Sequence, residues 1–599
     1  MAVVAGALAL CATIASGQAA GAVPLPPTPP AGVQAAPRAG GDTLTAADSI
    51  ARDTVRAPLA VAHRPLTPER RGARYVWDRQ AIFANGAVTL TDLLADVPGV
   101  TVANAGFIQA PTATSWYGDA GQVRVFLDGV ELDALDRRTG GVADLATIPI
   151  WYLEEVAVER GAAELRVHLR SWRVRYTVPS TRTDILTGSE NTNLYRGFYG
   201  KRLRNGGAVQ FGAQQSSTTS LRTGGDGDAL SPFGRIGWAS GRLSVDAMAS
   251  KFGRTRSSMS RDVLAGAPVQ NAIPRFEGDD AYAHLRATWG SPDTVGVWVQ
   301  AIASAQRHRE TGDSTPGADT AVSQSQFVLT AGGNRWGIDL AGTARVRVRD
   351  AESRLATAIR ASWTGRWAAL AAFAETGGPD STDRLDVVGS LTPIRWVQLQ
   401  TAFGLRRPTD DSIGGPTVSM GRAAVTVNAF GRWLSAGAVH RTATTTPGWV
   451  VFDPRFAAAT LEPATALEVS LGGALWGPFT FAWRGLRWQE AGAYRPQVES
   501  RAEVRVASDF RRQIKRGTFG LSAAAIHEYR GGMTIPLTGG GVRETQGAAV
   551  FGTVLDMRLG SAHIFWHNRN AVGKVYETVP GFLMPRLVQL YGVRWDFWN

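Results

Sequence analysis

The chain has 599 residues, of which 44% are hydrophobic and 9% aromatic, so it is long enough for two domains of either a soluble or a membrane protein. No run of roughly 18 apolar residues follows the signal-like N-terminus, which excludes a helical membrane protein and leaves a closed β-barrel as the only membrane-spanning fold. The net charge of +12 comes almost wholly from arginines that alternate with apolar residues. This pattern favours barrel-wall residues facing a wet lumen over a nucleic-acid-binding surface.

The first 74 residues contain two segments that are not expected to pack a core. Residues 1–22 carry an apolar stretch followed by small residues, which predicts a secretory signal peptide. Cys11 in this segment is the only cysteine of the chain, so the mature protein is expected to lack disulfides and thiolate metal sites. Residues 23–74 are rich in alanine and proline, which predicts a flexible periplasmic tail.

Residues 75–181 mix helical and strand patterns, which predicts a small α/β domain. The apolar residues of 89–97 (TLTDLLADV) lie on one helical face, and Pro98-Gly99 ends this helix. Residues 122–127 (QVRVFL) alternate like a strand and meet a turn at Asp128-Gly129. A second strand is expected over residues 155–158.

Residues 182–599 break into about 22 short segments in which polar and apolar residues alternate. In residues 395–406, for example, Leu399 and Phe403 lie on one face of the strand, and Gln398 and Gln400 lie on the other. The links between segments are alternately short and long, whereas a soluble sandwich has no reason to sort its loops by length. We therefore predict a membrane all-β fold, a 22-stranded antiparallel transmembrane barrel whose wide lumen is filled by the α/β domain.

Tryptophans mark the side of the short links. Eight of them lie within a few residues of a short link, which is typical of an aromatic girdle at a membrane interface. These are Trp238, Trp289, Trp336, Trp363, Trp367, Trp396, Trp433 and Trp476.

Three segments of the α/β domain, taken with the last strand, resemble the TonB-dependent outer-membrane receptors. Residues 90–102 (LTDLLADVPGVTV), 123–130 (VRVFLDGV) and 148–161 (IPIWYLEEVAVERG) follow the order and approximate spacing of that family's plug domain. Residues 586–597 (RLVQLYGVRWDF) resemble the family's C-terminal strand, whose aromatic end helps the barrel assembly machinery recognise its client. The resemblance is carried by Leu93, Pro98, Gly99, Asp128, Gly129, Glu159, Arg160 and Gly161 in the plug and by Tyr591, Trp595 and Phe597 in the last strand.

The resemblance implies a set of partners. In the family, a short coupling box near the mature N-terminus pairs as an added strand with the periplasmic energy-transducing protein TonB. Residues 42–46 (DTLTA) are one possible box, and an ordinary linker is another interpretation. The other implied partners are the barrel assembly machinery, outer-membrane lipid and an unknown small solute. The better candidate for the coupling box is residues 53–61, with Asp53, Thr54, Val55, Leu59 and Val61.

The resemblance weakens directly after Arg160-Gly161. The family usually continues through an aromatic-glycine pair and a Gly-Gly into an apolar strand, whereas residues 162–170 of this chain are AAELRVHLR. The strand pattern survives, but the glycine-rich approach to it does not. This departure concerns how the plug moves and whether it is energised in the family's usual way.

The sequence offers no pattern for a catalytic nucleophile or a phosphate-binding loop. His563 and His567 lie on one face of a predicted strand, but at roughly 3.3 Å per residue they are about 13 Å apart and cannot share a metal ion. We therefore expect no catalytic residue, no cofactor and no metal site. Aromatic residues of the predicted long loops either contact a ligand or pack the loops together; the candidates are Trp449, Phe452, Tyr494 and Tyr529.

These expectations define a primary hypothesis and an alternative. The primary hypothesis is an outer-membrane receptor that binds a scarce solute and imports it by TonB-coupled opening of the plug. The alternative is a passive porin-like channel or a surface-binding barrel with a vestigial plug, motivated by the altered residues 162–170. An outer-membrane enzyme has no positive feature in the sequence.

Overall fold

The computed structural model describes residues 75–106, 108–162, 164–219, 226–261, 269–291, 295–311, 320–378, 381–409, 416–510 and 519–598. The predicted signal peptide, the periplasmic tail and both candidate coupling boxes lie outside these residues. Within the described part of the chain, no helix is both long and apolar enough to cross a membrane.

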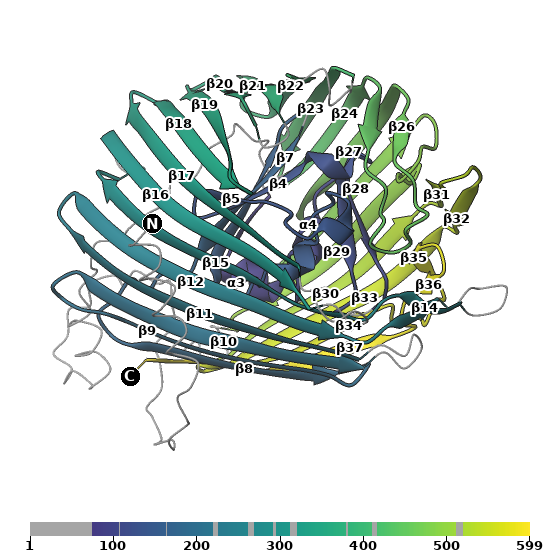
Figure 1. The fold of residues 1–599 in the computed structure, drawn as a ribbon, viewed down its shortest axis with the longest axis horizontal. Helices are drawn as coiled ribbons and strands as arrows, with labels where there is room; N and C mark the ends of the chain where they lie inside the picture. Colours follow the sequence, from purple (N-terminus) through teal and green to yellow (C-terminus); the bar gives the residue numbers. More distant parts are fainter. Residues whose placement is uncertain are drawn as a thin grey trace.

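Twenty-two antiparallel strands form a closed barrel around a smaller α/β domain (Figure 1). The last strand pairs with the first, with Phe597 opposite Thr181, and this pairing closes the ring. The predicted plugged 22-stranded barrel is therefore confirmed. In chain order the barrel strands are β8 (Ser180–Gly188), β9 (Thr192–Arg202), β10 (Gly207–Thr219), β11 (Asp226–Ser240), β12 (Leu243–Arg256), β15 (Phe276–Trp289), β16 (Gly296–Glu310), β17 (Thr320–Arg335), β18 (Ile338–Arg349), β19 (Glu352–Thr364), β20 (Ala368–Thr376), β21 (Thr382–Ile394), β22 (Val397–Pro408), β23 (Val418–Ala429), β24 (Arg432–Arg441), β27 (Ala464–Ala474), β28 (Phe479–Trp488), β29 (Val498–Ser508), β30 (Phe519–Arg530), β33 (Ala548–Leu559), β34 (Ala562–Arg569) and β37 (Val588–Trp598).

The barrel strands alternate between two environments. On β22, Leu399 and Phe403 lie exposed on the outer surface, whereas Gln398 and Gln400 point inward and are buried. The same alternation exposes Leu555 of β33 and Tyr591 of β37. An apolar outer surface with a polar interior is what a barrel in an outer membrane requires.

The predicted sorting of links by length holds with exceptions. On the long-loop side, β8 and β9 are joined only by residues 189–191, and β18 and β19 only by residues 350–351. Left-handed backbone at Asn191 and Asp350 makes these tight turns possible. On the opposite side, the link 509–518 between β29 and β30 is longer than its neighbours. The strict alternation predicted from the sequence is therefore wrong at these places.

The tryptophans near the short links mostly face outward. Seven of the eight have exposed side chains, and Trp433 is half-buried. Trp336, in the tight turn between β17 and β18, is 81% exposed. This arrangement is that of an interfacial aromatic belt.

The inner domain, called the plug below, is built on a five-stranded sheet in the order β1-β6-β7-β4-β5, in which β4 and β7 are parallel. Asp92 accepts hydrogen bonds from the N–H and the hydroxyl of Thr89 and so begins helix α4, which ends at Leu94, earlier than predicted. The plug elements are β1 (Val76–Asp78), α3 (Arg79–Ala84), α4 (Leu90–Leu94), β2 (Val100–Asn104), β3 (Thr112–Trp116), the 3-10 helix η2 (Ala120–Gln122), β4 (Val123–Leu127), β5 (Val130–Leu132), the 3-10 helices η3 (Arg137–Thr139) and η4 (Leu145–Thr147), β6 (Leu153–Arg160) and β7 (Leu165–Ser171).

Long loops fold over the plug and bury a second apolar cluster. Trp449 and Phe456 of the loop 442–463 pack there with Phe582 of the loop 570–587 and with Ala103 and Ala113 of the β2–β3 hairpin. Four short hairpins within the loops support this cluster, and most of their labelled strands lie together at the right of Figure 1. They are β13 (Met259–Arg261) with β14 (Val269–Ile273), β25 (Thr444–Thr446) with β26 (Ala459–Leu461), β31 (Met533–Pro536) with β32 (Val542–Thr545), and β35 (Glu577–Val579) with β36 (Phe582–Leu583).

We expect Gly206→Ala to destabilise the barrel more than Gly431→Ala. Both glycines have left-handed φ angles, +89° and +74°, so both substitutions carry a backbone cost of about 1 kcal/mol. A Cβ atom at residue 206 would also lie 1.9 Å from the carbonyl oxygen of Ala239, whereas one at residue 431 meets nothing within 4 Å. The measurement is the temperature at which the folded barrel band disappears in semi-native electrophoresis. Equal shifts for the two variants would contradict the expectation.

Candidate functional site

One face of the plug sheet is apolar and the opposite face is charged. On β7, Leu165 and Val167 point into the hydrophobic core, and the intervening Arg166 points the other way, beside Glu159 of the neighbouring β6. The charged face lies against the barrel wall, where Arg360 of β19 donates a hydrogen bond to Glu159 at 2.6 Å. On this side the plug is therefore held to the wall by ion pairs, which we call the plug–wall charge network.

Glu131 of β5 is the anionic centre of the network. Its carboxylate accepts from Arg124 Nε at 2.6 Å, from Arg345 Nη1 at 2.8 Å and from Arg347. Burial alone would raise the pKa of Glu131, but Arg124 and Arg347 reverse that effect and hold the pKa well below its usual range. Glu131 is therefore ionised at neutral pH although only 2% of its surface is exposed.

Arg166 is the matching cationic centre. Its guanidinium contacts Glu164 at 2.5 Å, Asp386 of β21 at 2.7 Å and Glu159 at 3.1 Å. Asp386 also accepts a hydrogen bond from the backbone N–H of residue 162 at 2.8 Å. A Cβ at Gly161 would lie 2.7 Å from the Asp386 carboxylate, so this glycine allows the plug backbone to approach the wall.

The network is balanced across the plug–wall boundary. The plug contributes two arginines and four carboxylates, whereas the wall contributes four arginines and two carboxylates. Such desolvated charges are tolerated only when each is paired and hydrogen-bonded. The plug members are Arg124, Arg166, Glu131, Asp133, Glu159 and Glu164, and the wall members are Arg345, Arg347, Arg360, Arg384, Glu375 and Asp386.

Arg160 ties two of the predicted plug motifs together and to a different part of the wall. Its Nη2 donates to Glu468 of β27 at 2.7 Å, and to the Pro98 carbonyl and the Tyr117 hydroxyl at 3.2 Å each. Gly99 has a φ of +88°, and a Cβ there would lie 2.4 Å from the Tyr117 ring. Leu93 is fully buried in the plug core. The motif residues therefore position the plug against the barrel.

The Asp128-Gly129 motif forms the turn between β4 and β5, with left-handed backbone at both residues. Asp128 accepts from the Ser171 N–H at 3.1 Å and from its hydroxyl at 2.5 Å. Burial alone would raise the pKa of Asp128, but Arg235 and Arg286 of the wall lower it to about 2. This motif therefore also depends on the wall, in this case through two of its arginines.

The residues after Gly161 acquire a definite role in this arrangement. Glu164 and Arg166, which stand where the family has a glycine-rich approach, supply the central ion pairs to Arg384 and Asp386. Sequence reasoning identified the departure but missed the wall partners, because they lie on strands more than two hundred residues away. The only available signal was the alternation of charged with apolar residues in 164–170.

The predicted ligand-contacting aromatics are not available to a ligand in this conformation. Trp449, Phe452 and Tyr494 are each no more than 1% exposed and pack in the loop cluster. Tyr529 is 40% exposed and lies on β30 next to Glu528, whose inward side chain pairs with Arg501. Because neighbouring residues of a strand point to opposite faces, Tyr529 faces away from the lumen. Of the two interpretations that the sequence left open, loop packing describes three of these residues in this conformation, and the fourth lies on the outer wall.

The other predicted positions are where the strand pattern placed them. Tyr591 and Trp595 of β37 are exposed on the outer wall, and the Trp595 and Phe597 rings lie 4.9 Å apart. His563 accepts or donates a hydrogen bond with Asp556 at 2.8 Å. His567 lies beside Gly86 of the plug.

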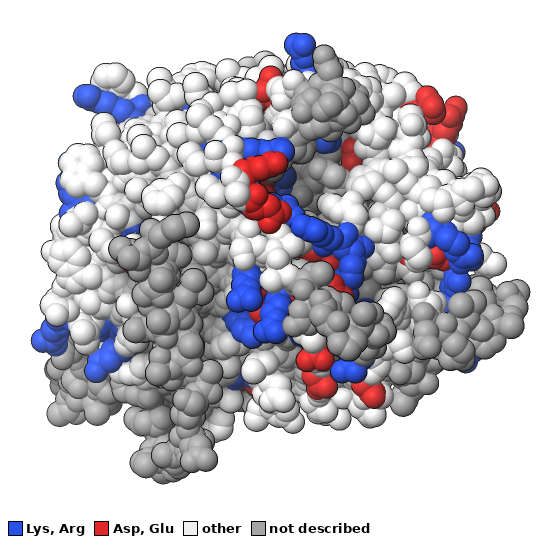
Figure 2. Space-filling model, viewed as in Figure 1, with Lys and Arg blue, Asp and Glu red and all other residues white. Residues whose placement is uncertain are grey.

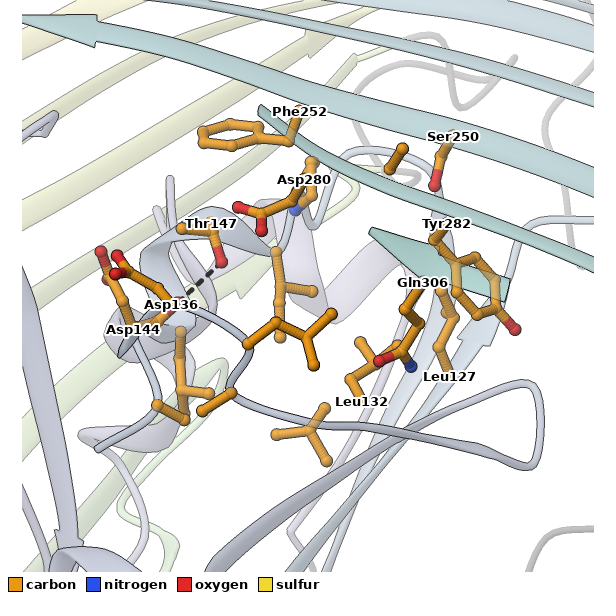
Figure 3. Close-up of a pocket in the computed structure, with 18 of the residues that line it drawn as sticks. Leu127, Leu132, Asp136, Asp144, Thr147, Ser250, Phe252, Asp280, Tyr282 and Gln306 are labelled. Carbon is orange, nitrogen blue, oxygen red and sulfur yellow. Dashed lines mark hydrogen bonds between the residues drawn. The ribbon is translucent and has the colours of Figure 1, made fainter. Parts of the chain in front are cut away.

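A cavity of about 140 Å³ lies between the plug and strands β11, β12, β15 and β16. In Figure 3 Asp136 and Asp144 of the plug approach it from one side, and Asp280 and Tyr282 of β15 line the opposite side. On the face drawn in Figure 2, charged side chains gather around the central hollow and are sparse over the surrounding wall. Charged side chains are therefore concentrated at the centre of this face.

Comparison with known proteins identifies this architecture. Residues 69–168 match the family described as TonB-dependent Receptor Plug Domain, and no curated sequence matches the chain. The fold is similar to the FrpB iron transporter from Neisseria meningitidis, with 10% identity over 88% of this chain and 100% of that chain and a TM-score of 0.67. It is also similar to the siderophore receptor PirA from Acinetobacter baumannii (9%, 87% and 98%, 0.66) and the ferric enterobactin receptor PfeA from Pseudomonas aeruginosa (9%, 88% and 100%, 0.64). The chain has the plugged-barrel fold of the TonB-dependent outer-membrane receptors.

We expect Glu131→Gln to loosen the plug by about 3 to 5 kcal/mol, because it leaves buried arginines without their common partner. Glu352→Gln is the matched control, since Glu352 makes a solvent-exposed pair with Arg354 at 3.5 Å, a type of pair that contributes at most about 1 kcal/mol. Amide hydrogen exchange of β4, β5 and β7 measures the effect. Equal protection of these strands in both variants would exclude Glu131 as an anchor.

Acidification should weaken the contact between the Asp128 turn and the wall only at low pH. Because the folded pKa of about 2 lies below the ordinary value, the stabilisation is complete near neutral pH and is lost as the pH falls from about 4 to about 2. Asp128→Asn keeps the side-chain shape but cannot ionise, so its plug should be less stable than wild type by about 2 kcal/mol at pH 7. Hydrogen exchange at several pH values should show this difference shrinking toward pH 2. A difference that is constant with pH would contradict the assignment.

Proposed function

We propose that this outer-membrane barrel is a receptor that binds a scarce solute at its outer face and imports it when TonB pulls on the N-terminal segment and opens the plug. The observation that carries the proposal is the plug–wall charge network, in which the plug fills the barrel and is anchored by desolvated ion pairs. Breaking a buried pair without replacing it costs about 3 to 5 kcal/mol. A plug anchored by several such pairs needs external work to move.

The connectivity of the plug sheet supports a route for that work. The first described strand, β1, is at the sheet edge and, among the described strands, pairs with β6 alone, with Val76 opposite Ala157. β6 ends at Glu159 and Arg160, which bond Arg360 and Glu468 of the wall. A pull on the chain before β1 would therefore load the strand that carries two wall anchors. Residues 53–61 are our proposed coupling box, with residues 42–46 as the alternative.

The class of solute is proposed from the structural neighbours. The similar structures include an iron transporter and receptors for a siderophore and for ferric enterobactin. A metal ion or metal chelate is therefore the first class to screen.

The surface-binding alternative is supported by a specific observation. Residues 162–170 replace a glycine-rich approach with Glu164 and Arg166, which pin the plug to β21 through Arg384 and Asp386. A plug anchored in this way also suits a surface-binding barrel that never opens.

Uptake of a radiolabelled ferric siderophore separates these functions. We expect uptake to stop when the proton gradient is dissipated and when residues 53–61 are deleted, because both remove the pull on the plug. Deletion of residues 24–32, which removes the same length of tail, should leave uptake intact. Uptake that persists without a gradient and without 53–61 would establish a passive channel, and surface binding without uptake would establish a binding barrel.

A further inference from the structure

A plug carboxylate and two wall side chains meet at the edge of the cavity. Asp136 follows β5 in the plug, and His308 and Glu310 lie on the inward face near the long-loop end of β16. One ligand atom from each residue lies within 4.8 Å of the other two. Imidazole nitrogen and carboxylate oxygen are both ligands of zinc and related divalent metals.

The His308 imidazole has the orientation typical of a metal ligand, with one ring nitrogen held by a carboxylate and the other left to coordinate. Its Nδ1 is 2.8 Å from Asp280 Oδ1, so an Nδ1–H donates to that carboxylate and leaves the lone pair on Nε2. The Nε2 atom is buried, has no hydrogen-bond partner among the described residues, and lies 3.9 Å from Asp136 Oδ1. Two electron-pair donors therefore face each other across a gap that a cation would fill.

Arg138 currently supplies positive charge to the same place. Its guanidinium contacts Asp136 at 2.6 Å and Glu310 at 3.0 Å and lies 4.0 Å from the centre of the Phe276 ring. About a third of the Arg138 side chain is exposed, so it can swing toward solvent without leaving a buried cation behind. Arg138 balances the two carboxylates but makes no hydrogen bond to His308 Nε2.

The geometry points to a divalent transition-metal site formed by Asp136, His308 and Glu310, with Asp280 positioning the imidazole. Zn–N and Zn–O bonds of about 2.0 to 2.2 Å require the ligand atoms to draw together, and Asp136 and Glu310 are part-exposed side chains that can do so. Three protein ligands leave a fourth position for water or a solute donor. Because Asp136 belongs to the plug and the others to the wall, a bound ion would link the plug to β16. This inference does not depend on energised transport.

The test is metal binding to the purified full-length protein in detergent. Calorimetry with Zn²⁺ and visible absorption with Co²⁺ should detect one site in the wild-type barrel. Glu310→Gln and His308→Ala should each weaken binding at least about tenfold, and Asp280→Asn should weaken it by about 10- to 100-fold through loss of imidazole orientation. Arg138→Ala should tighten binding, because it removes the competing cation.

His563→Ala is the matched control. His563 makes the same 2.8 Å contact with a carboxylate, Asp556, but no third metal-binding group was found beside this pair in the described residues. Wild-type affinity in His563→Ala with weaker binding in Glu310→Gln supports the site. Glu310 is part-exposed, so this variant tests the site even if His308→Ala does not fold. Unchanged affinity in Glu310→Gln, or no gain in Arg138→Ala, would overturn the inference whatever the uptake assay shows.

Discussion

The desolvated charge network between plug and wall determines how the plug is held within the barrel. A plug sheet with one apolar face can bury that face in its own core, but its other face must then meet the barrel. Here that face carries Glu131, Glu159 and Arg166. The facing wall contributes more arginines than carboxylates to the network. Because an unpaired buried charge is so costly, the ion pairs specify one position and orientation of the plug within the barrel.

The network also changes the interpretation of the chain's basic character. The sequence suggested arginines facing a wet lumen, and many do line the inner wall. Arg345, Arg347 and Arg384, however, are buried by the plug rather than bathed in water. Part of the positive charge therefore holds the plug in the barrel. The cavity beside β12 and β15 marks where the plug fits the wall less closely.

The long loops form a second set of contacts with the plug, on its β2–β3 hairpin. Their aromatic residues, which the sequence left divided between ligand contact and loop packing, form an apolar cluster with Trp449 and Phe582 against small alanines of the plug. Charge holds one side of the plug and apolar packing covers another. In the proposed mechanism, an opening motion that starts at β1 would meet the ion pairs of β6 directly, whereas the loop cluster lies on the β2–β3 hairpin.

The sequence by itself determined the barrel. Strand periodicity, link length and the plug motifs are patterns within short stretches of the chain, so they can be recognised without the tertiary structure. It also located the departure at residues 162–170. Only the tertiary structure decided what that departure does, since Asp386, Arg360 and Glu468 reach the plug from strands that barrel closure brings around it. The packing of the loop aromatics and the proximity of Asp136 to His308 likewise result from the closure of the barrel. Contacts between residues hundreds of positions apart leave no local period in the chain.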